Sequence, residues 1–214
     1  ADIDNHAQNV LAMAEGMALG NYQFIKYKTG DNKKENSLQE IQIHSEKVNK
    51  NDIDELNILT TAVYNGRDLS NEPVCYLNAV QLAERFKQLF KNLPVKVQVL
   101  NKKQIEEQKM GGLLAVNKGS IDPPSFTIME YKPTKAINKK PLVLVGKGVV
   151  YDTGGLNIKT MKYMDNMKSD MSGASYVSNA LFAIASAKLP IHVIALTPAT
   201  DNRPGGNAYA SGDI

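Results

Sequence analysis

Side chains able to do chemistry are concentrated between residues 147 and 170. Two lysines and two aspartates stand there in a short polar stretch: Lys147, Asp152, Lys159 and Asp170. Carboxylate oxygens suit divalent ions such as Zn, Mn, Mg or Co. A lysine amine coordinates a metal only when it is neutral, and a nearby cation can lower the pKa of the amine enough for that. These residues are therefore a candidate metal site that includes lysine.

The first two of these residues lie in a glycine-rich segment, residues 146–155. The apolar run just before it predicts a buried strand, and ligands bind beyond the carboxyl ends of strands in open α/β sheets. A phosphate-binding loop would need glycine in place of Pro141 and Ser or Thr in place of Gly148. A dinucleotide-binding loop would need its third glycine in place of Tyr151. Neither nucleotide-binding motif is matched.

Each candidate residue also has a structural alternative. Asp152 and Asp170 could be turn or cap residues, and Lys159 could be a solvated surface lysine. Methionines 161, 164, 167 and 171 could be adaptable filler of the core. His192 lies in an apolar run and is interpreted as structural, because no histidine pair has metal-site spacing. We favour the metal interpretation for both aspartates.

Hydrophobic periodicity predicts the elements that must position these side chains. Helices are predicted over residues 9–19, from about 52, from about 78 and over 173–188. Strands are predicted over residues 38–43, 95–100, 113–116, 126–131, 142–151 and 191–196. Residues 67–73 are polar and end in proline, which predicts irregular structure. The final strand, helix and strand predict a parallel crossover, so we expect a mixed, largely parallel α/β sheet with helices on both sides.

Composition excludes several classes of protein. The net charge is only +3, and the lysines in residues 26–34 and 132–140 are dispersed, so we do not expect nucleic-acid binding. No apolar run approaches the ~20 residues that a membrane span requires. A single cysteine, Cys75, excludes an internal disulfide and favours a reducing compartment. We therefore expect a cytoplasmic protein.

Two segments, residues 145–159 and 167–174, resemble the metal-binding region of the leucyl aminopeptidase (cytosol aminopeptidase) family. The agreement extends over nearly the whole chain, through residues 67–73, 111–116, 119–120 and 201–202. The resemblance implies a zinc-exopeptidase-like catalytic domain over residues 37–214, incomplete at its C-terminal end. Residues 1–36 would be the connecting helix and linker of a mostly absent N-terminal domain.

The resemblance also implies a role for each candidate residue. Lys147, Asp152 and Asp170 would bind the first of two divalent ions, with Asp152 bridging to the second. These ions would be Zn or Mn, with Mg or Co as alternatives. Lys159 would be the catalytic lysine, whose ammonium polarises the scissile carbonyl and stabilises the oxyanion. Met167 would line the pocket for the first side chain of the substrate.

The chain departs from the family at its end. In the family, an Asn-Thr-Asp-Ala-Glu-Gly-Arg segment follows shortly after the region that matches residues 212–214, where this chain stops. That segment supplies two further metal ligands and an arginine that holds a bicarbonate general base. We therefore expect these 214 residues alone to be inactive.

The leading functional hypothesis is a two-metal aminopeptidase that removes leucine-type N-terminal residues from peptides. The resemblance implies a homohexamer. Two alternatives remain open at this point. The chain could be a non-catalytic fragment or scaffold member of the family, because carboxylates are missing, or a nucleic-acid-binding relative.

Overall fold

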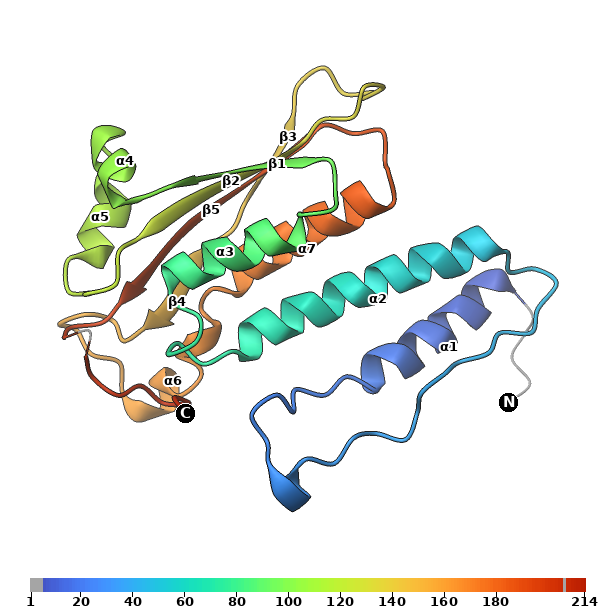
Figure 1. Cartoon of the computed structure of the whole chain (residues 1–214), viewed down its shortest axis with the longest axis horizontal. Coiled ribbons are helices and arrows are strands. Elements are labelled where there is room, and N and C mark those ends of the chain that lie inside the picture. The colour runs from blue at the N-terminus through green and yellow to red at the C-terminus, as the bar shows by residue number, and fades with distance from the viewer. Residues whose placement is uncertain (1–5, 206) are drawn as a thin grey trace. The chain divides into compact units, whose positions relative to one another are not determined.

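The computed structural model describes residues 6–205 and 207–214, which form a mixed α/β fold (Figure 1). The chain divides into two compact units that meet at Asp68 and Leu69. The candidate site residues all belong to the second unit. The predicted domain boundary at residues 36 and 37 falls inside the first unit and stays a prediction.

The first unit contains α1 (Ala7–Gly20), the short 3₁₀ helix η1 (Gly30–Asn32) and most of α2 (Lys50–Asn71). The end of α2 is tied to the end of α1, because Arg67 Nη1 donates to the carbonyl of Leu19 at 2.7 Å. Both helices were predicted from their periodicity. The structure differs from the prediction in the end of α2, which continues to Asn71 in the second unit.

The sheet of the second unit has the order β1-β2-β5-β3, and β4 also pairs with β5. Its strands are β1 (Val95–Leu100), β2 (Ser125–Tyr131), β3 (Leu142–Val145), β4 (Gly148–Asp152) and β5 (Val193–Asn202). The β1–β2 and β2–β5 pairs are antiparallel, whereas β3 and β4 run parallel to β5. The mixed α/β sheet is thus confirmed, although parallel pairing accounts for only half of the strand pairs.

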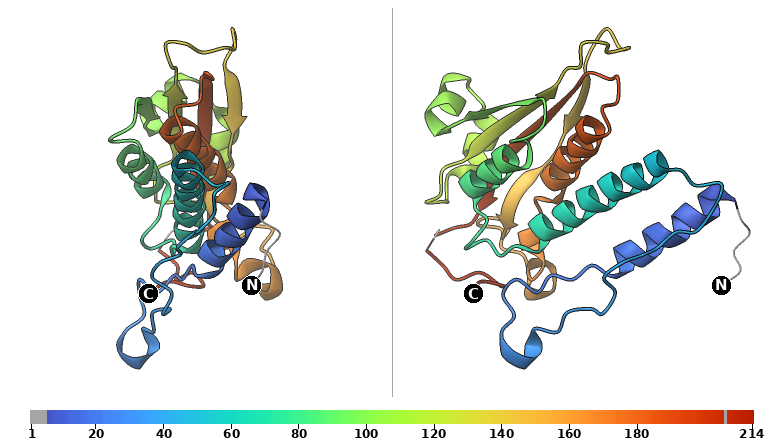
Figure 2. Two further views of the ribbon diagram at one scale, coloured as in Figure 1. Left: turned by 90° about the vertical axis from the view of Figure 1, so that its right-hand side faces the viewer. Right: turned by 45° about the vertical axis from the view of Figure 1, so that its right-hand side comes forward.

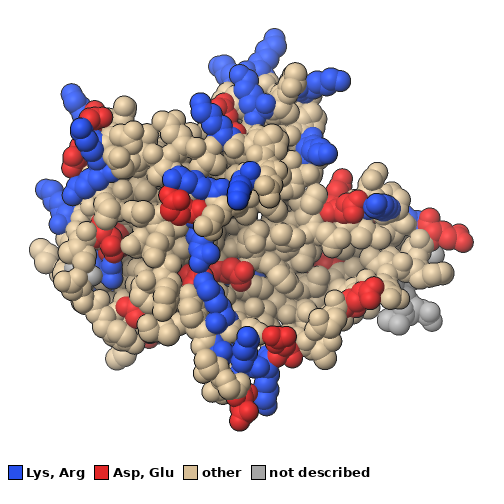
Figure 3. Space-filling model, in the orientation of Figure 1, with Lys and Arg blue, Asp and Glu red and all other residues tan. Residues whose placement is uncertain are grey.

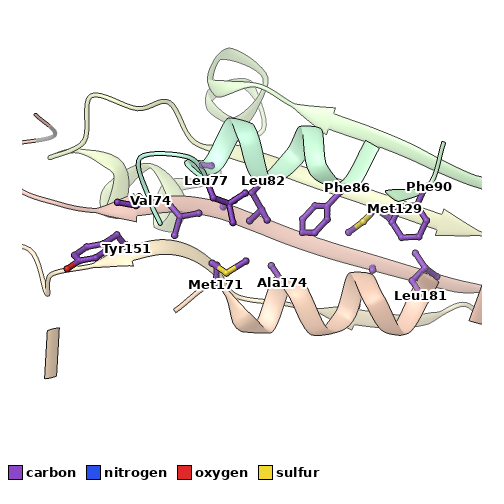
Figure 4. Close-up of a cluster of buried hydrophobic side chains, with 14 of the residues drawn as sticks. Val74, Leu77, Leu82, Phe86, Phe90, Met129, Tyr151, Met171, Ala174 and Leu181 are labelled. Carbon is purple, nitrogen blue, oxygen red and sulfur yellow. The ribbon is translucent and has the colours of Figure 1, made fainter. Parts of the chain in front are cut away.

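Two helices, α3 (Ala79–Leu89) and α7 (Ser172–Ser186), pack along one face of this sheet (Figure 2). Figure 4 shows the core that they enclose, in which Phe86 of α3, Met129 of β2 and Leu181 of α7 are fully buried. Asn78 caps α3, since its side chain accepts from two backbone N–H groups of the first turn. Burial of this apolar face stabilises the sheet that presents the candidate site.

The opposite face carries α5 (Gly111–Asn117), which packs against β5. Side chains alternate along a strand, so Pro198 on the α5 side and Ala199 in the core lie on opposite faces of β5. Helices therefore flank the sheet on both sides, as predicted. The remaining short helices are α4 (Lys102–Glu107), α6 (Met161–Met164) and η2 (Met167–Ser169).

Two predicted strands are wrong. Residues 38–43 form no strand, because no neighbouring strand among the described residues pairs with their backbone groups. Residues 113–116 belong to helix α5. This apolar run is too short for its periodicity to distinguish a helix from a strand.

Two predicted boundaries are also wrong. Residues 67–71 are the last residues of helix α2. The helix ends shortly before Pro73, because the proline ring disfavours helical conformation in the residue that precedes it. The single strand predicted over residues 142–151 is divided into β3 and β4 at Gly146 and Lys147. The chain is divided there because Gly146 packs closely against Gly173 and Ala174 at the start of α7.

The charged side chains are mixed on the face shown in Figure 3, where Lys and Arg are interspersed with Asp and Glu. Within residues 6–205 and 207–214, none of the helices combines the length and apolar character that a membrane span requires. The predictions on nucleic-acid binding and on cellular compartment stay predictions.

Candidate metal and catalytic site

Lys147 lies where the link between β3 and β4 passes the start of α7. A Cβ atom added to Gly146 would lie 2.4 Å from the carbonyl oxygen of Gly173, so only glycine fits this approach. The amide of Ala174 donates to the carbonyl of Lys147 at 2.8 Å. The Lys147 backbone is therefore fixed against the first turn of α7, close to Asp170.

This close packing leads to a stability prediction. We expect Gly146→Ala to lower the free energy of unfolding by about 1–3 kcal/mol or more, because the new methyl group meets backbone atoms that cannot move aside. Gly16→Ala in α1 is the matched control, since nothing lies within 4 Å of its added Cβ. Alanine should stabilise that exposed helix. Urea unfolding of both variants is the measurement, and equal stabilities would contradict the packing argument.

The first ion pair joins Lys147 to Asp170. Lys147 Nζ lies 2.6 Å from Asp170 Oδ2, and the Asp170 side chain is 19% exposed. Although this distance is short, Asp170 Oδ2 is buried and makes no hydrogen bond of normal geometry. The 2.6 Å separation makes the two side chains an ion pair. Asp170 Oδ2 is therefore a buried oxygen that is paired by charge but accepts no hydrogen bond from the described residues.

The second ion pair joins Lys159 to Asp152 at the carboxyl end of β4. Lys159 Nζ lies 2.8 Å from Asp152 Oδ2, while Asp152 Oδ1 accepts from the Gly154 amide and from Asn202 Nδ2. Burial raises the pKa of Asp152, but the hydrogen bonds from Lys159, Gly154 and Asn202 outweigh it, so the pKa is lowered overall. Asp152 is therefore held as a carboxylate.

Lys159 also connects this pair to Met167. Its Nζ donates to Met167 Sδ at 2.9 Å, and its backbone amide donates to the carbonyl of Thr153 at 2.8 Å. Met167 begins η2, which packs against β4, and Asp170 directly follows η2. The two ion pairs therefore lie around one short helix.

The structure thus brings Lys147 to Asp170, and Lys159 to Asp152 and Met167. Convergence of Lys147, Asp152 and Asp170 on one ion stays a prediction. The donor types fit a divalent ion, since Asp152 and Asp170 offer two carboxylates, one with a buried oxygen that makes no hydrogen bond, and Lys147 offers an amine. They are few for two ions, because the described part of the chain contains no group of three His, Cys, Asp or Glu residues suited to a metal.

Sequence reasoning missed Asn202 as a site residue. Between Val149 and Asp152, β4 contains one more residue than the matching part of β5, and this bulge aligns Asp152 with Asn202. The only signal in the sequence was that the family resemblance includes residues 201–202. It did not indicate a contact with Asp152.

Comparison with known proteins identifies one family model. Residues 65–214 match the model described as "Cytosol aminopeptidase family, catalytic domain". The chain is also 53% identical to a probable cytosol aminopeptidase of Chlorobaculum tepidum over 148 residues, which are 69% of this chain and 29% of that protein.

Two solved structures are also similar to this chain. The bottromycin maturation enzyme BotP in complex with Mn is 31% identical with a TM-score of 0.82, over 97% of this chain and 43% of that one. The cytosol aminopeptidase of Coxiella burnetii is 29% identical with a TM-score of 0.76, over 97% of this chain and 42% of that one. The chain therefore spans less than half the length of each of these similar proteins.

Proposed function

Because this chain belongs to the cytosol aminopeptidase family, we propose that it forms part of a metal-dependent enzyme that removes leucine-type N-terminal residues from peptides. The observation that carries this proposal is the pair of Lys–Asp contacts around η2 and the end of β4. A scaffold without catalysis has no need for two half-buried aspartates that are each paired with a lysine, one of them at the end of β4, where ligands usually bind.

In this proposal Lys147, Asp152 and Asp170 hold a divalent ion. A bound ion would polarise the substrate and lower the pKa of a water molecule. Without metal, each carboxylate has its charge compensated by a lysine ammonium. A bound cation would take over the compensation of these carboxylate charges, and Lys147 would hold it through the nitrogen of its side chain. Mn and Zn are the favoured ions, and the Mn complex of BotP supports Mn.

In this proposal Lys159 acts on the substrate. Its ammonium is largely buried, with 28% of the side chain exposed, so a hydrogen bond from it is stronger than in water. Lys159 Nζ would donate to the scissile carbonyl of a bound substrate and to the oxyanion that develops there. Such a donor contributes about 3 kcal/mol to transition-state stabilisation.

Met167 forms a wall of the pocket for the first side chain of the substrate. Its sulfur lies 2.9 Å from Lys159 Nζ, which supports a position beside the scissile bond. A flexible thioether adapts to leucine-type side chains. A homohexamer, and a bicarbonate held by an arginine outside these residues, stay predictions from the family resemblance.

A direct test compares the protein encoded by the complete gene with the 214 residues alone. We expect the complete protein to hydrolyse leucine p-nitroanilide with Mn or Zn, and the 214-residue chain to show no measurable turnover. The reason is that its described residues offer two paired aspartates but no group of three acidic, His or Cys ligands. Metal content is measured alongside. Robust turnover by the short chain, or two ions bound to it, would contradict this expectation.

The same experiment separates the enzyme from the non-catalytic alternative. A complete protein that binds no divalent ion and hydrolyses no anilide would be a scaffold member of the family. The two Lys–Asp contacts would then have only a structural role.

A further inference from the structure

Asn202, the last residue of β5, makes two kinds of contact with the end of β4. Its side-chain Nδ2 donates to Asp152 Oδ1 at 2.8 Å. Its backbone carbonyl accepts from the Thr153 amide at 3.0 Å and from the Thr153 hydroxyl at 2.7 Å. The backbone contact therefore holds the turn, whereas the side chain reaches the aspartate itself.

The turn after Asp152 is built closely around the Asn202 amide. Gly155 has a φ of +71°, and a Cβ added there would lie 3.2 Å from Asn202 Oδ1. The β4 bulge places Asp152 opposite Asn202 in the strand register. Because of this alignment, the Asn202 side chain is directed at Asp152.

The two carboxylate oxygens of Asp152 have different partners. Oδ1 accepts from Asn202 Nδ2 and from the Gly154 amide, whereas Oδ2 faces Lys159 Nζ at 2.8 Å. Both donors to Oδ1 are neutral, so they orient the carboxylate without cancelling its charge. This division leaves Oδ2 as the oxygen directed toward a cation.

We propose that Asn202 is a positioning residue, whose amide holds Asp152 by Oδ1 and so presents Oδ2 to the catalytic cation. This inference rests on the proposed function and adds a residue to it. A partner that orients a ligating carboxylate typically contributes 10- to 100-fold to metal affinity. The side chain has this role separately from the backbone, since the carbonyl that binds Thr153 is present with any residue at this position.

The test measures Mn binding by electron paramagnetic resonance in the metal-free protein from the complete gene. We expect Asn202→Leu to weaken Mn binding about 10- to 100-fold. Asn202→Ser should give a similar loss of Mn affinity, because its shorter side chain cannot span the 2.8 Å contact. This second variant replaces the leucine variant if the latter folds poorly. Loss of Mn affinity in a variant with a normal unfolding midpoint would support positioning.

Asn138→Leu is the matched control. Asn138 Nδ2 donates to the carbonyls of Lys140 and His192, next to the beginning of β5 and away from the candidate ligands. The substitution is chemically the same, so it should lower stability and leave Mn affinity unchanged. Equal losses of Mn affinity in the Asn202 and Asn138 variants would overturn the proposal.

A crystal structure of metal-free Asn202→Leu separates this inference from the proposed function. Positioning predicts that the Asp152 carboxylate rotates away from its wild-type orientation, whether or not the wild type binds Mn. An unchanged Asp152 side chain would overturn the role of Asn202. Absence of Mn binding by the wild type, with Asp152 displaced in the variant, would overturn the proposed function and leave the orienting role supported.

Discussion

In the complete protein, Asp152→Ala is expected to abolish metal binding and peptidase activity together. Asp152 is the carboxylate on which Lys159, Gly154 and Asn202 all converge, and its lowered pKa keeps it anionic. Removing a residue that only supports a ligand weakens metal binding by up to about 100-fold, so removing the ligand itself should exceed that loss. Metal content and turnover of leucine p-nitroanilide are the measurements.

The control for this variant is Asp165→Ala. Asp165 lies in the same polar stretch but is exposed. The hydrogen bond that its Oδ1 accepts from the Ser211 hydroxyl is long, at 3.5 Å. Its substitution should change neither metal content nor turnover. Normal metal content in Asp152→Ala would show that Asp152 is not a ligand and would contradict the metal site as proposed.

Lys159→Ala should produce a different result, with turnover falling about 100- to 1000-fold while metal binding changes little. The reason is that the Lys159 ammonium acts mainly on the charge that develops in the transition state. The variant should therefore lower kcat and kcat/KM by similar factors. Steady-state kinetics and metal titration measure the two effects separately.

Lys162→Ala is the control for charge, because Lys162 is an exposed lysine on the adjacent helix α6. It should retain wild-type turnover. If Lys159→Ala and Asp152→Ala lose metal to the same extent, Lys159 is a ligand or a structural support and its proposed catalytic role is wrong.

Local sequence determined many of the elements. The periodicities that predicted α1, α3, α7, β1 and β2 are confirmed, because each segment has enough residues to define a period. Asn78 caps α3 through its own side chain, an interaction over a few residues. Residues 113–116 show the limit, since a short apolar run is compatible with helix and strand, and in the structure it belongs to α5, which packs against β5.

Pairing of the strands could not be determined from the sequence. The strand β2 pairs antiparallel with β1 and with β5, both of which are distant from it in the chain, and a run of apolar residues does not specify such a neighbour. The break between β3 and β4 likewise depends on the packing of Gly146 against the start of α7. These are properties of the assembled sheet.

At the candidate site, the sequence by itself determined which groups are present: two lysines and two aspartates at a characteristic spacing, and the family to which that spacing belongs. Only the tertiary structure decided how they pair, with Lys147 next to Asp170 and Lys159 next to Asp152. It also brought Asn202 to Asp152 across 50 residues of chain. The physical reason is the one-residue bulge in β4, which pairs Asp152 with Asn202. An extra residue in one strand changes which of its side chains lies opposite a given residue of the neighbouring strand. This register is a property of the paired strands and not of either strand alone.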